Sequence, residues 1–166
     1  MSESPPDPIS QRSRGAPGAA PIYSDRASGR VFPDAGTMVN TYLERFAERS
    51  GKQVAALDHD GYTQVRAGSV SVGIDVLEDH GVLMFFAPVM HVPASGKEKF
   101  YRRLLELSFL QTADAAFGID EQKDEVYVRA LRRLSGLDYE EFEDLLDTVG
   151  KVADEWDDIL KKEFGT

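Results

Sequence analysis

The spacing of apolar residues changes several times along the chain, and the order of these changes limits the fold more than any other feature. In residues 37–50 apolar side chains recur at helical spacing, and in residues 54–89 apolar residues alternate with small or polar ones, with a period of two. Helical spacing returns in 96–109, alternation returns in 112–131, and a last helical stripe begins after Asp138. The sequence therefore predicts an α+β fold, an antiparallel sheet with helices in the order α-β-β-β-α-β-β-α.

Candidate capping residues mark the ends of the predicted helices. Thr37 stands where it can cap the first helix, and Gly51 stands where that helix would stop. The Ser95 hydroxyl and the Glu98 carboxylate are spaced as a capping box for the second helix. Asp138 has the corresponding position before the last helix. We expect these residues to fix the helix boundaries.

Residues 1–36 differ from the rest of the chain in composition. Six of the eight prolines lie in residues 5–33, among serine, glycine and alanine, and no periodic apolar pattern runs through them. We therefore expect 1–36 to be a flexible, disordered N-terminal tail and 37–166 to be one folded domain. Residues 30–32, Arg-Val-Phe, are interpreted either as a docking segment or as part of a tail without function.

Charge and composition exclude several classes of protein. The formal net charge is −10, and the excess lies in residues 37–166, because 1–36 contain four acidic and four basic residues. Such a surface repels a phosphate backbone, so we expect no nucleic-acid partner. No apolar run approaches the roughly 18 residues of a membrane span, and residues 1–10 lack the features of a signal peptide. With no cysteine, the chain is expected to be soluble and cytoplasmic, without a membrane partner.

Residues 114–130 gather five acidic side chains around Lys123, which raises the question of a metal loop. Counted from Asp120, an EF-hand needs a glycine at the sixth position and a glutamate at the twelfth. The sequence has Glu125 and Leu131 there. We interpret this stretch as the turn between two antiparallel strands, with its carboxylates in water.

Histidines give no catalytic pattern either. His59 lies between Asp58 and Asp60, but no nucleophile is placed near it by sequence, and His80 and His91 do not have the spacing of a ligand set. We predict that the protein is not an enzyme and has no catalytic residue, no cofactor and no metal site.

The strand expected at residues 82–89 has apolar side chains of both parities, so both of its faces are hydrophobic. One face must be covered by a helix of the chain, and the other needs a helix, a second copy or a partner. We assign the even-numbered residues, Val82, Met84 and Phe86, to the core. We assign Leu83 and Phe85 to the partner side.

The last helix has an equally wide apolar stripe. Leu146, Ala153, Leu160 and Phe164 extend it beyond a narrow seam. Trp156 belongs to this stripe, and we interpret it as a core residue or a dimer contact.

Three segments carry a resemblance to a known family. "LLELSF", "AAFGIDEQKDEVYVRALRRL" and "LDYEEFEDLLDTVGKVADEWDDIL" together resemble the YbjN domain family and, more broadly, the CesT-like type III secretion chaperones. The resemblance covers residues 37–164, with Ser108 at a position where asparagine is common in the family. It implies a small, acidic, homodimeric bacterial protein without enzymatic activity.

The same resemblance implies a function. We expect a dimeric protein-binding module with chaperone-like function, which holds an extended segment of a client protein on apolar surface. The alternative is a regulatory module on the same fold, in which the second apolar face shelters a small ligand. Residues 1–36 fall outside the resemblance.

Overall fold

A computed structural model describes residues 20–165, and residues 1–19 and 166 lie outside the description. The described elements are β1 (Tyr23–Ser24), β2 (Val31–Phe32), α2 (Ala35–Ser50), β3 (Tyr62–Ala67), β4 (Val70–Leu77), the 3₁₀ helix η1 (Glu78–His80), β5 (Val82–His91), α3 (Lys97–Leu110), β6 (Ala116–Asp120), β7 (Glu125–Arg133) and α4 (Tyr139–Phe164). Apart from the short β1, β2 and η1, the order is the predicted α-β-β-β-α-β-β-α. The predicted α+β class with an antiparallel sheet is confirmed.

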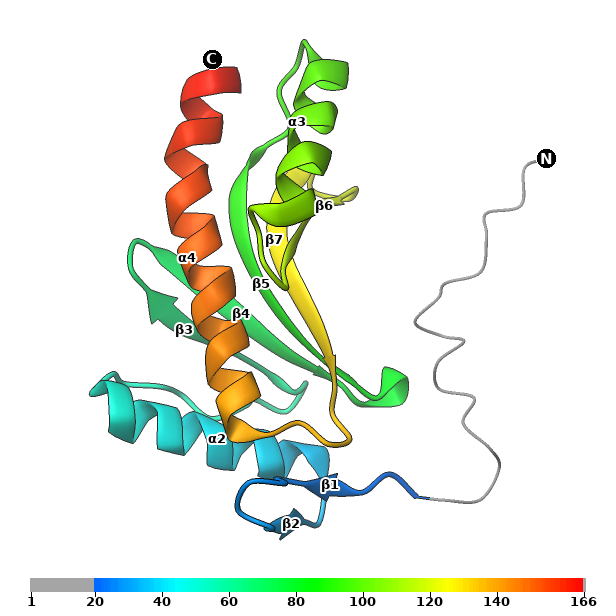
Figure 1. Ribbon diagram of the computed structural model, residues 1–166, viewed down its shortest axis with the longest axis vertical. Helices are drawn as coiled ribbons and strands as arrows, with labels where there is room; N and C mark the ends of the chain where they lie inside the picture. Colours follow the sequence, from blue (N-terminus) through cyan, green and yellow to red (C-terminus); the bar gives the residue numbers. More distant parts are fainter. Residues whose placement is uncertain (1–19, 166) are drawn as a thin grey trace, which may run out of the picture.

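Strands β3 to β7 form one antiparallel sheet in the order β3-β4-β5-β7-β6, so β5 is central and β3 and β6 are its edges. Helix α4 runs along one face of the sheet, α2 lies across one end, and α3 stands beside β6 (Figure 1). In the described part of the chain, no helix covers the opposite face. We call that opposite face the open face.

The core lies between α4 and the sheet. The inner side of α4 is apolar along its length, and Phe142 packs edge to face against Phe85 of β5, with ring centroids 5.4 Å apart. Gly150 brings the helix close to the β3–β4 hairpin, because a Cβ at this position would lie 2.6 Å from the Cβ of Ala67. The long helix therefore packs directly and closely against this face of the sheet.

Part of the predicted tail is folded. Within residues 20–36, strands β1 and β2 pair as a short hairpin, and the side chains of Tyr23 and Phe32 are buried. The Phe32 ring packs edge to face against Tyr42 of α2 at 5.8 Å. The prediction of a flexible segment is therefore wrong for residues 20–36, and the part that concerns residues 1–19 lies outside the described residues.

This N-terminal hairpin also supplies a hydrogen-bond acceptor for the first turn of α4. The buried carboxylate of Asp25 accepts hydrogen bonds from the backbone N–H of Ser28 at 2.9 Å and of Tyr139, the first residue of α4, at 3.2 Å. Burial alone would raise the pKa of Asp25, but these N–H donors outweigh it and hold the pKa below its ordinary value. A negative charge is thus held at the positive end of the helix dipole.

The predicted caps are partly correct. Gly51 ends α2 in the left-handed region, with φ of 68°, as expected. The N-cap of α2 is Asp34 and not Thr37, because the Asp34 carboxylate accepts the Thr37 N–H at 2.6 Å. The helix consequently begins three residues earlier than a cap at Thr37 predicts.

The capping box predicted for α3 is wrong. Gly96 occupies the N-cap position with φ of 68°, and Ser95 makes no capping hydrogen bond. Asp138 is the N-cap residue of α4 as predicted, but its carboxylate accepts the backbone N–H of Arg26 at 2.6 Å and none from its own helix. Asp25 therefore supplies the capping carboxylate that Asp138 does not.

Candidate functional site

The two faces of β5 are the reverse of the prediction. Leu83 and Phe85 are fully buried beneath α4, in the main core. Met84 and Phe86 point to the open face and are only partly buried. The assignment of Leu83 and Phe85 to the partner side is therefore corrected, since the helix-covered side of the strand is the odd-numbered one. Val82, at the first position of β5, is buried even though its parity is even.

Aromatic rings cross the open face in a row. Phe86 on β5 has its ring centroid 6.2 Å from Tyr62 of β3 and 6.0 Å from Tyr127 of β7. The row passes over Gly73 of β4, which pairs directly with Phe86. We call Tyr62, Phe86 and Tyr127 the aromatic row; it presents apolar surface that the described chain leaves without a covering helix.

A hollow of about 360 Å³ lies beside this row. Its size falls within the usual range for a site that receives a ligand or a side chain. The residues around it come from β5, β6, β7 and the turn between β6 and β7: Met84, Phe86, Gly118, Ile119, Asp120, Lys123, Tyr127 and Arg129.

The acidic stretch that surrounds Lys123 is the predicted hairpin, so this prediction is confirmed. Strands β6 and β7 pair up to Asp120 and Glu125, and Asp124 turns the chain with φ of 50°. The Asp120 carboxylate accepts the backbone N–H of Gln122 at 3.0 Å, and the Glu125 carboxylate accepts the Tyr127 hydroxyl at 2.8 Å. Asp120 and Glu125 thus have structural partners within the turn.

Lys123 folds back from this turn over the aromatic row. Its ammonium lies 5.7 Å from the centroid of the Tyr127 ring and 3.4 Å from the Tyr127 hydroxyl. That hydrogen bond, followed by nearby charges, raises the pKa of Lys123, so the cation persists at one end of the hollow. Burial raises the pKa of Tyr127, which keeps its hydroxyl neutral.

A second apolar surface lies on α3. Leu105 is 73% exposed and Phe109 is 82% exposed, and Tyr101 precedes them at the same helical spacing. Leu110 and, on the neighbouring edge strand β6, Ile119 extend the surface. We call Tyr101, Leu105, Phe109 and Leu110 the α3 stripe. Sequence reasoning used the buried Phe100, Leu104 and Leu107 and missed the stripe, although the surplus of apolar residues in the segment was its signal.

Trp156 is packed against the core but is not completely buried. The guanidinium of Arg103 on α3 lies 5.6 Å from its ring centroid, and Arg103 also binds the Glu163 carboxylate through two nitrogens at 3.2 Å. This places Trp156 at the junction of α3 and α4, which agrees with a core role. A dimer contact through Trp156 stays a prediction.

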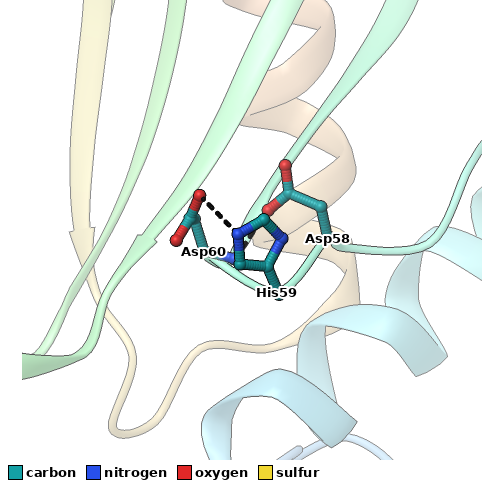
Figure 2. Close-up of side chains that lie close together, drawn as sticks. All are labelled: Asp58, His59 and Asp60. Atoms are coloured by element: carbon teal, nitrogen blue, oxygen red, sulfur yellow. Dashed lines mark hydrogen bonds and ion pairs between the residues drawn. The ribbon is translucent and has the colours of Figure 1, made fainter.

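Asp58, His59 and Asp60 form an exposed cluster in the turn before β3 (Figure 2). The Asp58 carboxylate accepts the backbone N–H of Asp60 at 2.9 Å and of Tyr62 at 3.0 Å, and the Tyr62 bond chiefly holds its pKa below the ordinary value. His59 Nε2 lies 3.1 Å from Asp60 Oδ2, in solvent. The cluster therefore forms a solvated turn, in which Asp58 shapes the backbone.

Of the helices in residues 20–165, none combines the length and the apolar composition that crossing a bilayer requires.

The five-stranded antiparallel sheet, with one long helix on one face, matches the fold of solved structures of type III secretion chaperones. The chain belongs to the Tir chaperone protein (CesT) family, whose family model matches residues 41–157. The predicted resemblance is thus confirmed. Comparison with curated proteins gave no match.

Solved structures share this fold. The chain is similar to a chain of the ExsC–ExsE complex, with a TM-score of 0.63 and 27% identity over 76% of this chain and 96% of that one. It is similar to a chain of the heterodimeric ExoU–SpcU complex from the type III secretion system of Pseudomonas aeruginosa, with a TM-score of 0.58 and 17% identity over 75% and 98% of the two chains. YbjN of E. coli, a putative transcription regulator, aligns with a TM-score of 0.52 and 16% identity over 72% and 91%.

Proposed function

We propose that the protein is a non-enzymatic, homodimeric module with chaperone-like function, which holds an extended segment of a client protein on the open face of its sheet. The aromatic row is the observation that carries this proposal. Tyr62, Phe86 and Tyr127 lie on three different strands, and no described segment of the chain covers them. An extended segment that crosses the strands can contact all three rings.

The family supports protein binding as the general role. The family is named for a chaperone, and one structure of the same fold is a complex of a chaperone with an effector, HopA1–SchA, at a TM-score of 0.60 and 12% identity. The acidic, cysteine-free composition fits a cytoplasmic protein, and that is the compartment in which we expect the client to be held.

The α3 stripe supports a homodimer. Monomeric soluble proteins rarely leave a contiguous apolar patch of this kind in water, and α3 projects it beside the free edge of β6. Two copies related by a two-fold axis would bury the stripe against itself. The open face would then remain accessible in both copies, because the aromatic row lies on the sheet and not on α3.

The function can be tested with two variants, one on the open face and one on the exposed side of α4. Proteins that co-purify with the wild-type chain are identified, and the candidate client is purified and recombined with the chain to establish a stable complex. Phe86→Ser should remain folded and lose the complex. Lys151→Ser, at an exposed position of α4, is the control and should retain it.

Two outcomes would contradict the proposal. A reconstituted complex that is unaffected by Phe86→Ser would place the client elsewhere. A defined small mass retained by the wild-type protein in native mass spectrometry, and lost in Phe86→Ser, would support the ligand-responsive regulator instead.

A further inference from the structure

The charges of the protein are distributed unevenly between its two sides. Helix α4 contains ten acidic and three basic residues, so it accounts for most of the net charge of −10. This helix covers the face of the sheet opposite to the aromatic row. The two sides of the sheet therefore present different charges to a partner.

The open face carries arginines. Residues that pair directly across antiparallel strands point to the same side of a sheet. Arg129 of β7 pairs with Phe86, Arg133 of β7 pairs with Val82, and Arg66 of β3 pairs with Ser71 two residues from Gly73. All three arginines are therefore on the side of the aromatic row, and all three are exposed.

These arginines have no carboxylate partner within residues 20–165. None of the three takes part in an ion pair, whereas the neighbouring Arg132, which points to the helix side, pairs with Glu141. Arg66 Nε donates to the carbonyl of Gly68 at 3.2 Å, within its own turn. In an acidic protein, unpaired arginines grouped on one face indicate that the complementary anion comes from outside the described fold.

Arg129 stands where an anion and an apolar group would be bound together. It lines the hollow beside Phe86 and Tyr127, and its Nε would lie 3.5 Å from a Cβ at Gly118, so its side chain extends over β6. Lys123 lies at the same hollow. The apolar floor and the cations thus occur within one small region.

We propose that the open face selects acidic client segments: an apolar side chain of the segment enters the hollow at Phe86 and Tyr127, and neighbouring carboxylates of the segment pair with Arg129 and Arg66. This inference rests on the proposed function and adds the chemistry of the client. An extended segment, which presents alternate side chains to opposite sides, places two carboxylates and an apolar residue on this face when they are spaced by two.

Acidic residues of the open face do not pair with its three arginines. Glu125 accepts the Tyr127 hydroxyl, and Asp120 accepts backbone N–H groups of its turn. Asp120 also lies 3.9 Å from the Lys123 ammonium, so it pairs with Lys123 and with none of the three arginines. Asp75 is a further carboxyl on this face, opposite Met84, and burial, followed by the charges of Asp58 and Asp60, raises its pKa. Arg66, Arg129 and Arg133 are therefore left without a carboxylate partner among residues 20–165 and are open to carboxylates of a client.

The test uses a phage-displayed library of random peptides of about 15 residues, selected on the full-length wild-type protein. Recovered peptides should be rich in Asp and Glu beside apolar residues. One such peptide, made synthetically with a fluorescent label, should bind about tenfold more weakly to Arg129→Glu than to the wild type, and more weakly at high salt. Lys151→Glu on α4 makes the same change in net charge and should bind as the wild type does.

The outcomes separate this inference from the proposed function. Apolar peptides without acidic enrichment, or basic peptides, that lose binding in Phe86→Ser would overturn the charge selection and leave client binding intact. Peptides that bind Phe86→Ser normally, or no recovered peptides, would overturn both. Binding seen only after removal of residues 1–19 would show that the chain's own N-terminal segment occupies the face and would overturn the assignment to a partner.

Discussion

The ring of Phe86 lies directly on Gly73. A Cβ added at position 73 would come within 2.5 Å of Phe86 Cζ, closer than real Cβ atoms approach another heavy atom. The absence of a side chain at Gly73 therefore gives the Phe86 ring room to pack on the backbone of β4. In this position the ring lies between Tyr62 and Tyr127.

Gly73→Ala should displace Phe86. Overpacking of this kind typically costs about 1–3 kcal/mol, so we expect the free energy of unfolding in urea to fall by that amount and client binding to weaken. Gly118→Ala is the matched control on the same face, because its nearest neighbour would be Arg129 Nε at 3.5 Å. Equal stability of the two variants would contradict the contact.

Phe85→Ser and Phe86→Ser should differ in stability. Phe85 is fully buried against Phe142, and truncation of such a ring costs about 3–5 kcal/mol, which is enough to unfold a marginal domain. Phe86 is partly exposed on the open face, so its variant should stay folded. Circular dichroism and thermal melting of both variants provide the measurement. A folded Phe85→Ser and an unfolded Phe86→Ser would restore the opposite assignment of the faces.

Asp25→Asn should weaken the start of α4. Asparagine keeps an acceptor oxygen but loses the negative charge at the helix N-terminus, which costs about 1 kcal/mol near neutral pH. Because the pKa of Asp25 is depressed in the folded protein, its charge stabilises the fold above the unfolded pKa of about 3.9. That stabilisation decreases as the pH falls below this value and is lost below the folded pKa.

The stability of the wild type and of Asp25→Asn should therefore differ at pH 7 and converge at acidic pH. Urea denaturation at a series of pH values measures this difference. Ser28→Ala is a useful companion, because it leaves the Asp25 carboxylate and its bond to Tyr139 in place. A constant difference across the pH range would show that the charge of Asp25 contributes nothing.

The α3 stripe should control assembly. Sedimentation equilibrium of the wild type should give about twice the 18.4 kDa chain mass at micromolar concentration. Leu105→Glu combined with Phe109→Glu should give the monomer mass, because two carboxylates would have to be buried in the interface. Lys151→Glu, exposed on α4 and away from the α3 stripe, should remain a dimer. A wild-type monomer at tens of micromolar would contradict the homodimer.

The element order could be predicted from sequence because most segments are long enough for the period of their apolar residues to be recognised. The β6–β7 hairpin followed from the alternation around Val126 and Val128. The face assignment of β5 could not be predicted. Leu83 and Phe85 are as apolar as Met84 and Phe86, so composition alone does not show which alternate residues face α4. Long-range packing decides the parity, through the contact between Phe85 and Phe142.

The N-terminal hairpin was missed for a related reason. Its strands have two residues each, too few for a period to be seen, and they lie among prolines and glycines. Its stability comes from residues distant in sequence, namely Tyr42 for Phe32 and the first turn of α4 for Asp25. The same holds for Asp138. Its position at the N-cap could be predicted from the local sequence, but its hydrogen bond to the distant Arg26 could not.

Photo-crosslinking at two positions tests most directly whether the open face binds a client and α3 binds a second copy. The photoreactive amino acid p-benzoylphenylalanine is introduced in place of Phe86 in one variant and in place of Phe109 in another, and the cells are irradiated. Position 86 should crosslink to a different protein through an acidic segment, and position 109 should crosslink two copies of this chain. Crosslinks from position 86 only to a second copy, with the client captured from position 109, would contradict both assignments.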